Sequence, residues 1–302
     1  MIGYRWIKGI YNIVIFCIIF LCVLSCNREV VNKEKEARRY FDNYQYNKAI
    51  EILETIKSSR RTAQVDLLLG KSYFAIFEFD KADRIFKNTF KNHPSIKDSV
   101  ISAYMSYAKR FEKRKREDLA VKAYISTLNI ESEYNIGNGF YTLGHHYYVL
   151  NELSKARYFL ERGFVTIADS RIYLKTKMEL MDTYEILGML EEAIEISQED
   201  ESDEILYRRG EISYKLAKDL FTKKDFDSSL IYCKDIIEVH KPKVLIDDTY
   251  FLMGEIYSEQ RDYGNALTCY KKVVKLDRFE NNALAYRAKK KIEVLTQIKE
   301  RK

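Results

Sequence analysis

Proline and glycine are scarce in this chain: its 302 residues include two prolines and eleven glycines. Both residues are typical of turns, so their scarcity argues against a protein built from many short strands and tight loops. The chain also lacks the short alternating runs of β-branched residues that indicate half-buried strands. Long amphipathic segments remain, and the sequence therefore predicts an all-α fold.

Cysteine is sparse as well, and three of the five cysteines lie within the first 26 residues. The other two, Cys233 and Cys269, are too few to make a disulfide framework. We expect both thiols to pack as small buried apolar groups, with a single disulfide between them as the alternative. The formal charge of +6 is too small to indicate nucleic-acid binding.

Recognisable motifs for catalysis or metal binding are missing. His145 and His146 are adjacent, so on a helix they point about 100° apart, whereas paired metal ligands are spaced by four residues. Gly137, Gly139 and Gly144 resemble a glycine-rich loop, but His145 stands where a phosphate loop has lysine. Neither a nucleophile elbow nor a redox cysteine pair is found. We therefore expect no enzyme activity, no metal and no cofactor.

The start of the chain has the parts of a bacterial export signal. Arg5 and Lys8 form a positive first section without acidic residues. An uninterrupted apolar run of twelve residues follows, from residue 13 to residue 24. A membrane-spanning helix needs about 20 residues, so this run has the length of a signal-peptide core.

Ser25-Cys26, directly after this run, resembles the lipobox of bacterial lipoproteins, in which the cysteine receives lipid and the preceding peptide is removed. The resemblance implies a signal peptide over residues 1–25 and an anchor of acyl chains such as palmitate on Cys26, followed by a polar tether up to residue 36. Ordinary secretion and a retained anchor helix are the alternatives. Asn27 replaces the aspartate that holds many lipoproteins at the inner membrane, which favours the outer membrane, facing the periplasm; surface exposure is left open.

A period of 33 to 38 residues runs through the rest of the chain. Its clearest mark is a small residue, which we expect where the two helices of a hairpin cross closely. A ring follows the same period and is expected to fill the space between one hairpin and the next. The small residues are Ala49, Ala82, Ala120, Ala156, Ala193, Ser229 and Ala266, and the rings are Tyr40, Tyr73, Phe111, Tyr147, Tyr184 and Tyr257.

These copies resemble the tetratricopeptide repeat, a helix-turn-helix of about 34 residues with the pattern Leu-Gly-x-x-Tyr, then Ala-x-x-x-Phe, then Pro. Leu69-Gly70-x-x-Tyr73, Ala82, Phe86 and Pro94 match that pattern. The resemblance covers about residues 37–298 and implies one right-handed α-solenoid of about seven hairpins with a C-terminal capping helix. Together with the signal, it is also loosely similar to envelope repeat lipoproteins of the BamD type.

In such solenoids the first helix of each hairpin lines a concave wall that binds extended peptides or partner helices. We expect a binding wall of mixed apolar and charged side chains here, with internal packing as the alternative. In the repeat register, its positions are Leu67, Lys71, Phe74, Met105, Lys109, Glu112, Tyr141, His145, Tyr148, Met178, Asp182, Glu185, Tyr214, Lys218, Phe221, Phe251 and Glu255.

Two charged segments stand out from this pattern. A basic run over residues 109–116 can contact anionic lipid headgroups or form a solvated turn. An acidic loop over residues 199–204 can receive a basic partner or simply hold a loop in water.

The sequence thus predicts a lipid-anchored scaffold for other proteins or peptide segments of the bacterial envelope, with outer-membrane protein or cell-wall assembly as its setting. The alternative is a lipoprotein that binds a peptide or glycan on exposed rings near Tyr141, Tyr148 and Tyr214.

Overall fold

The computed structural model describes residues 28–277 and 282–300, and all regular elements in these ranges are helices. The predicted signal peptide and Cys26 lie outside the described residues. The chain divides into two compact units, one ending at Thr142 and one beginning at Leu143. That residues 37–298 form one solenoid stays a prediction. In the described part of the chain, no helix is both long and apolar enough to cross a membrane.

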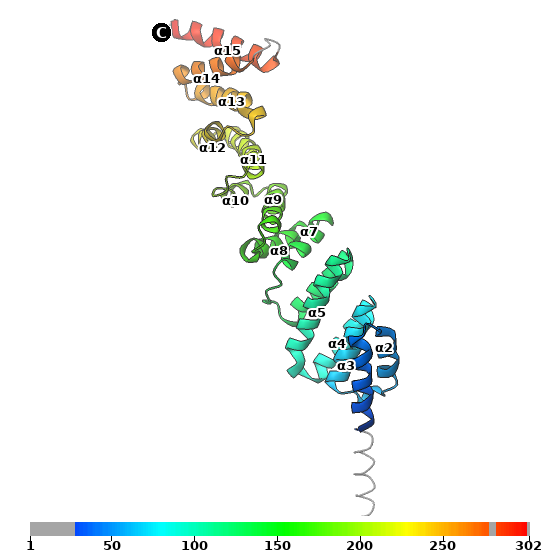
Figure 1. The fold of residues 1–302 in the computed structure, drawn as a ribbon. Helices are drawn as coiled ribbons and strands as arrows, with labels where there is room; N and C mark the ends of the chain where they lie inside the picture. The colour runs from blue at the N-terminus through cyan, green and yellow to red at the C-terminus, as the bar shows by residue number, and fades with distance from the viewer. Residues whose placement is uncertain (1–27, 278–281, 301–302) are drawn as a thin grey trace, which may run out of the picture. The chain divides into compact units, whose positions relative to one another are not determined.

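Three hairpins build the first unit (Figure 1). The first hairpin consists of a helix over residues 28–42 and α2 (Tyr46–Glu54), and η1 (Ser58–Arg60) follows it. The second consists of α3 (Ala63–Ala75) and α4 (Phe79–Asn92), and η2 (Pro94–Ile96) leads to the third, α5 (Lys97–Lys113) with α6 (Glu117–Ile130).

The helix over residues 28–42 corrects the expectation of a polar tether, because the residues from 28 onward are already helical. Val30 and Ala37, two turns apart on one face, are buried. Ion pairs one turn apart support the exposed face, with Lys33 2.7 Å from Glu29. The charges that made this segment resemble a tether are therefore the solvated side of an amphipathic helix.

The unit that begins at Leu143 continues the series of hairpins. Its helices are the remainder of α7 (Gly139–Val149), α8 (Leu153–Thr166), α9 (Ser170–Ile186), α10 (Leu190–Glu195), α11 (Asp203–Thr222), α12 (Phe226–Val239), η3 (Lys243–Leu245), α13 (Ile246–Glu259), α14 (Tyr263–Leu276) and α15 (Ala283–Glu300). Over residues 28–277 and 282–300 the helices form seven hairpins and a closing helix, which confirms the prediction. α15 packs on α13 and α14, as a capping helix should.

Small residues fix the crossing of the helices in each hairpin, as the period predicts. All seven, from Ala49 to Ala266, have no exposed surface. The turn between the two helices of each hairpin contains a residue with positive φ, five positions before the small residue. These turn residues are Tyr44, Phe77, Lys115, Asn151, Gly188, Lys224 and Arg261.

The rings expected between hairpins are buried at Tyr73, Phe111 and Tyr184 and half-buried at Tyr40, Tyr147 and Tyr257. Two of the buried tyrosines donate a hydrogen bond to a carboxylate on the second helix of the preceding hairpin. The Tyr184 hydroxyl lies 2.9 Å from Oε1 of Glu161, and Tyr73 bonds to Glu54 in the same way. The rings therefore join neighbouring hairpins by a polar contact as well as by packing.

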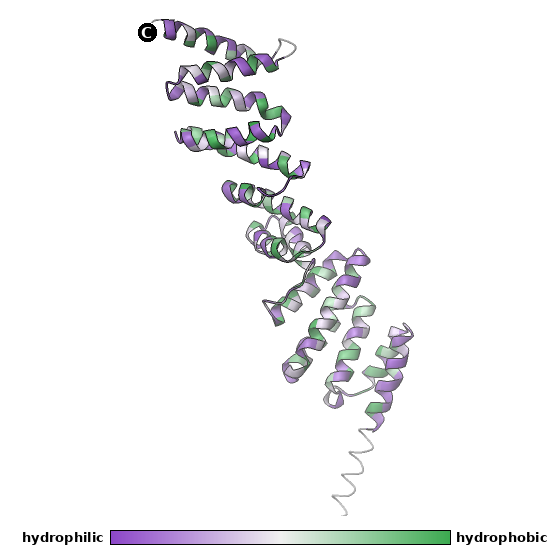
Figure 2. Ribbon diagram, turned by 60° about the vertical axis from the view of Figure 1, so that its left-hand side comes forward, coloured by the Kyte–Doolittle hydropathy of each residue, from purple (hydrophilic) through white to green (hydrophobic). Residues whose placement is uncertain are grey.

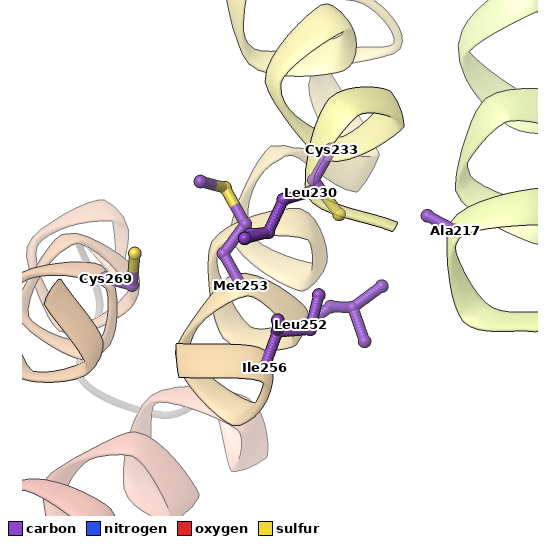
Figure 3. Close-up of a cluster of buried hydrophobic side chains, with 7 residues drawn as sticks. All are labelled: Ala217, Leu230, Cys233, Leu252, Met253, Ile256 and Cys269. Atoms are coloured by element: carbon purple, nitrogen blue, oxygen red, sulfur yellow. The ribbon is translucent and has the colours of Figure 1, made fainter. Parts of the chain in front are cut away.

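The two cysteines behave as predicted. Cys233 of α12 and Cys269 of α14 are both free and buried in one cluster with Leu252, Met253 and Ile256 of α13. Figure 3 shows the two sulfurs on different helices with Met253 drawn between them. Burial raises the pKa of Cys233 to about 12 and that of Cys269 to about 11, so both thiols are protonated near neutral pH.

Candidate functional site

The first helices of the hairpins carry the predicted wall, and apolar and polar residues alternate around them (Figure 2). Lys109 and Lys218 are exposed. The half-buried positions are Lys71, Met105, Glu112, Tyr141, His145, Tyr148, Met178, Asp182, Glu185, Tyr214, Phe221 and Glu255.

Phe74, Phe251 and Leu67 correct the predicted wall, because they are buried at 1%, 7% and 6% exposure. The Phe74 ring packs against the rings of Tyr104 and Tyr107 on α5, with centroids 5.5 and 5.2 Å away. A neighbouring hairpin thus covers the expected binding position. For these residues the alternative of internal packing is the correct one.

Arg208 organises the polar part of the first-helix row in the second unit. From α11, its Nε donates to Oδ1 of Asp182 on α9 at 2.7 Å, and a second nitrogen pairs with Glu185, one turn further along α9. Its third contact is Glu211 on its own helix, at 3.2 Å. One guanidinium therefore joins three carboxylates across two consecutive first helices.

Glu185 also accepts a bond of 2.9 Å from the exposed Lys215 ammonium. Burial raises the pKa of Glu185, but Lys215 and Arg208 outweigh burial and hold that pKa below its ordinary value. The carboxylate is thus ionised at neutral pH, and the row remains charged.

His145 and Tyr148 extend this row onto α7. Nδ1 of His145 lies 2.8 Å from Oε1 of Glu179 on α9. Burial, and then the charges of Asp182 and Glu179, raise the pKa of Tyr148. The sequence-predicted residues His145, Tyr148, Asp182 and Glu185 therefore do lie near one another.

Further along the second unit, aromatic and cationic side chains pair on the same row. The Lys218 ammonium lies 5.7 Å from the centre of the Tyr214 ring, and the Arg287 guanidinium lies 4.6 Å from that of Phe251. Glu255 bonds to Lys291 at 2.9 Å. Tyr141, Tyr148 and Tyr214 are each half-buried, so part of each side chain is accessible.

The two charged segments are partly occupied by the chain's own side chains. In the basic run, Arg116 forms two bonds of 3.0 Å to Asp118, and the Arg110 guanidinium lies 4.8 Å from the centre of the Tyr107 ring. In the acidic loop, Asp200 bonds to Lys177 at 3.1 Å and Asp203 pairs with Lys241. Part of each segment therefore stabilises the fold.

The row presents charged and aromatic side chains that are partly accessible. Within the described ranges, no three His, Cys, Asp or Glu side chains gather in a way that could hold a metal ion. The row places charged side chains beside aromatic rings and methionine side chains.

Sequence reasoning missed Arg208, Lys215 and Glu179, although each contacts a residue of the row. The sequence did contain a sign of these ion pairs. Asp182 and Glu185 are spaced by one turn on α9, and α11, the next first helix, carries basic residues that can pair with them. To find these residues, one would have had to compare the charges of two consecutive first helices. The repeat pattern compares only one equivalent position in each repeat.

This architecture defines a helical-hairpin repeat protein. More specifically, residues 247–280, which include α14 and all but the first residue of α13, match the family model described as tetratricopeptide repeat. The seventh hairpin thus matches the tetratricopeptide-repeat model, and the other six hairpins share its helix-turn-helix form and its buried small residue. No curated protein matches the chain.

Solved structures with a similar arrangement have low sequence identity. The complex of Naa15 and Naa10 bound to HypK-THB has 16% identity and a TM-score of 0.46, over 89% of this chain and 39% of that one. The C-terminal part of a repeat-containing protein from Cytophaga hutchinsonii has 17% identity and a TM-score of 0.40, covering 84% and 98%. YrrB, described as a TPR protein with an unusual peptide-binding site, has 18% identity and a TM-score of 0.38, covering 68% and 97%. This chain thus spans well under half of the Naa15-containing match.

Proposed function

We propose that this tetratricopeptide-repeat chain is a non-catalytic scaffold that binds segments of other proteins along the first helices of its hairpins. The observation that carries the proposal is the row of half-buried charged and aromatic side chains on α7, α9, α11 and α13. Half-burial holds these side chains in place through neighbours such as Arg208 and leaves part of each accessible. Amphipathic anchors held in this way are typical of protein-binding hot spots.

We further propose that the scaffold works in the bacterial envelope, anchored by lipid on Cys26, and most simply at the periplasmic face of the outer membrane. The export signal in residues 1–25 and the lipobox-like Ser25-Cys26 support this location. Its partners would then be envelope proteins, in outer-membrane protein or cell-wall assembly. Labelling cells with radioactive palmitate tests the anchor: the chain should take up label, and Cys26→Ala should abolish it.

Crosslinking in native membranes, followed by mass spectrometry, tests the scaffold. We expect defined protein partners at near-equal amounts, and we expect Lys215→Glu with Lys218→Glu to reduce their recovery several-fold. The matched control is Lys234→Glu with Lys271→Glu, which makes the same charge change at exposed positions of second helices. Recovery that is unchanged by the first pair, in a folded protein, would show that the row is not the binding surface.

A further inference from the structure

A groove of about 650 Å³ lies on the third hairpin, wholly within the unit that ends at Thr142. It lies beside the C-terminal half of α5 and the loop over residues 131–138 that follows α6. The lining residues that matter for binding are Met105, Lys109, Glu112 and Lys113 from α5, with Tyr134 and Asn138 from the loop.

Two cations, Lys109 and Lys113, line this groove. Lys109 and Lys113 are exposed and four residues apart, so they lie on the same face of α5. Neither forms an ion pair with the residues that the structure describes. The nearby carboxylate of Glu112 instead accepts a bond of 2.7 Å from Oγ1 of Thr142. Like charges one turn apart on a helix repel each other, and an external anion between Lys109 and Lys113 would relieve that repulsion.

The positive charge continues along the first helices of this unit. Arg38, Lys71 and Lys109 occupy the same position in three successive repeats. Burial, and then the charge of Arg38, lower the pKa of Lys71, so the positive charges of Arg38 and Lys71 act on each other. The corresponding positions in the second unit are mixed, being His145, Asp182, Lys218 and Glu255.

Formal charge separates the two units in the same way. Residues 28–142 contain 22 Lys and Arg against 16 Asp and Glu, a charge of +6. Residues 143–302 contain 27 against 29, a charge of −2. Complementary charge favours an acidic partner on the first unit only.

We propose that this groove docks an acidic segment of a partner protein, in which carboxylates lie beside an apolar side chain. The inference rests on the proposed scaffold function and names the class of segment that the first unit takes. The carboxylates would pair with Lys109 and Lys113, and the apolar side chain would pack against Met105 and Tyr134. A recess between a helix and a loop admits a narrow chain, whereas a flat bilayer surface cannot enter it.

Peptide selection on the purified full chain tests the proposal. A phage library of random peptides should yield binders enriched in Asp and Glu with at least one large apolar residue. We expect the strongest of them, labelled with fluorescein, to lose affinity about tenfold or more with Lys109→Glu and Lys113→Glu, and to weaken as salt increases. Lys57→Glu with Lys91→Glu, the same charge change at exposed positions of this unit, should alter the affinity by less than about twofold.

Three results would overturn the inference. Selected peptides without an acidic excess would do so, as would equal binding by the Lys109 and Lys113 variant. The third is a chain that binds phosphatidylglycerol vesicles but no acidic peptide, and that loses its vesicle binding when Lys109 and Lys113 are both changed to Glu. Circular dichroism checks folding, and Lys109→Gln with Lys113→Gln is the milder second variant. If crosslinked partners persist while the peptide prediction fails, only this inference falls; if neither partners nor peptides are found, the scaffold proposal falls with it.

Discussion

Gly254 of α13 faces the ring of Tyr270 on α14 so closely that a Cβ on the glycine would lie 2.6 Å from Cε1 of the ring. Tyr270 has no exposed surface, so the ring cannot swing into solvent. The same relationship joins Gly70 to Phe86 in the second hairpin and Gly144 to Leu160 in the fourth. Each of these hairpins thus has a glycine on its first helix where a large side chain of its second helix packs.

Gly254→Ala should therefore destabilise the second unit. Alanine improves helix propensity by about 1 kcal/mol. Overpacking against a fixed ring costs about 1 to 3 kcal/mol, so the net change is a loss of about 1 kcal/mol in the free energy of unfolding. Urea unfolding monitored by circular dichroism measures it. Gly264→Ala is the control, because a Cβ there has its nearest neighbour 3.6 Å away, and it should be neutral or stabilising.

The turns of the hairpins give a second prediction, because six of the seven place a non-glycine residue in the left-handed region. Lys224, with φ of 64°, is exposed, so Lys224→Gly should relieve backbone strain and stabilise the chain by up to about 1 kcal/mol. Gly188, with φ of 77° and no atom near its Cβ position, isolates the reverse change. Gly188→Ala should lower stability by about 1 kcal/mol in the same assay.

The period of small residues was predictable because a crossing of two helices leaves little space, whatever lies beyond the hairpin. Ala156 and Ser229 are buried for that local reason. Phe74 was not predictable in the same way: its place on α3 is shared by wall residues, and only the rings of α5 decide that it is covered. The groove was missed because its loop, over residues 131–138, lies outside the repeat pattern.

Hydrogen bonds between hairpins were also invisible to the pattern, which records a ring and not its hydroxyl. Tyr184→Phe removes the bond to Glu161 and keeps the ring. Since Glu161 is partly exposed and can bond to water instead, we expect a loss of about 1 kcal/mol in the free energy of unfolding. The size should fall to near zero when Glu161→Ala is already present, and a double-mutant cycle measures this coupling. An equal effect of Tyr184→Phe in both backgrounds would show that the bond contributes nothing.

Asp200 should make stability depend on pH through its bond to the buried Lys177. Burial raises the pKa of Asp200, but hydrogen bonds from Ser202 and the Lys177 ammonium outweigh burial and hold it below the ordinary value of 3.8. A lowered folded-state pKa contributes stability that is complete above the unfolded-state pKa and is lost as pH falls through the folded-state value. Wild type should therefore lose this contribution below about pH 4.

Asp200→Asn tests this directly. It leaves the Lys177 ammonium, at 5% exposure, without a carboxylate, so at pH 7 the free energy of unfolding should fall by about 1 to 3 kcal/mol. The difference between variant and wild type should then shrink as the pH is lowered from 5 to about 2, because wild type loses the same ion pair by protonation. Glu199→Gln, an exposed neighbour in the same loop, is the matched control and should change stability little at either pH. A difference that is constant over this pH range would mean that Asp200 acts through its hydrogen bonds to the loop and not through its charge.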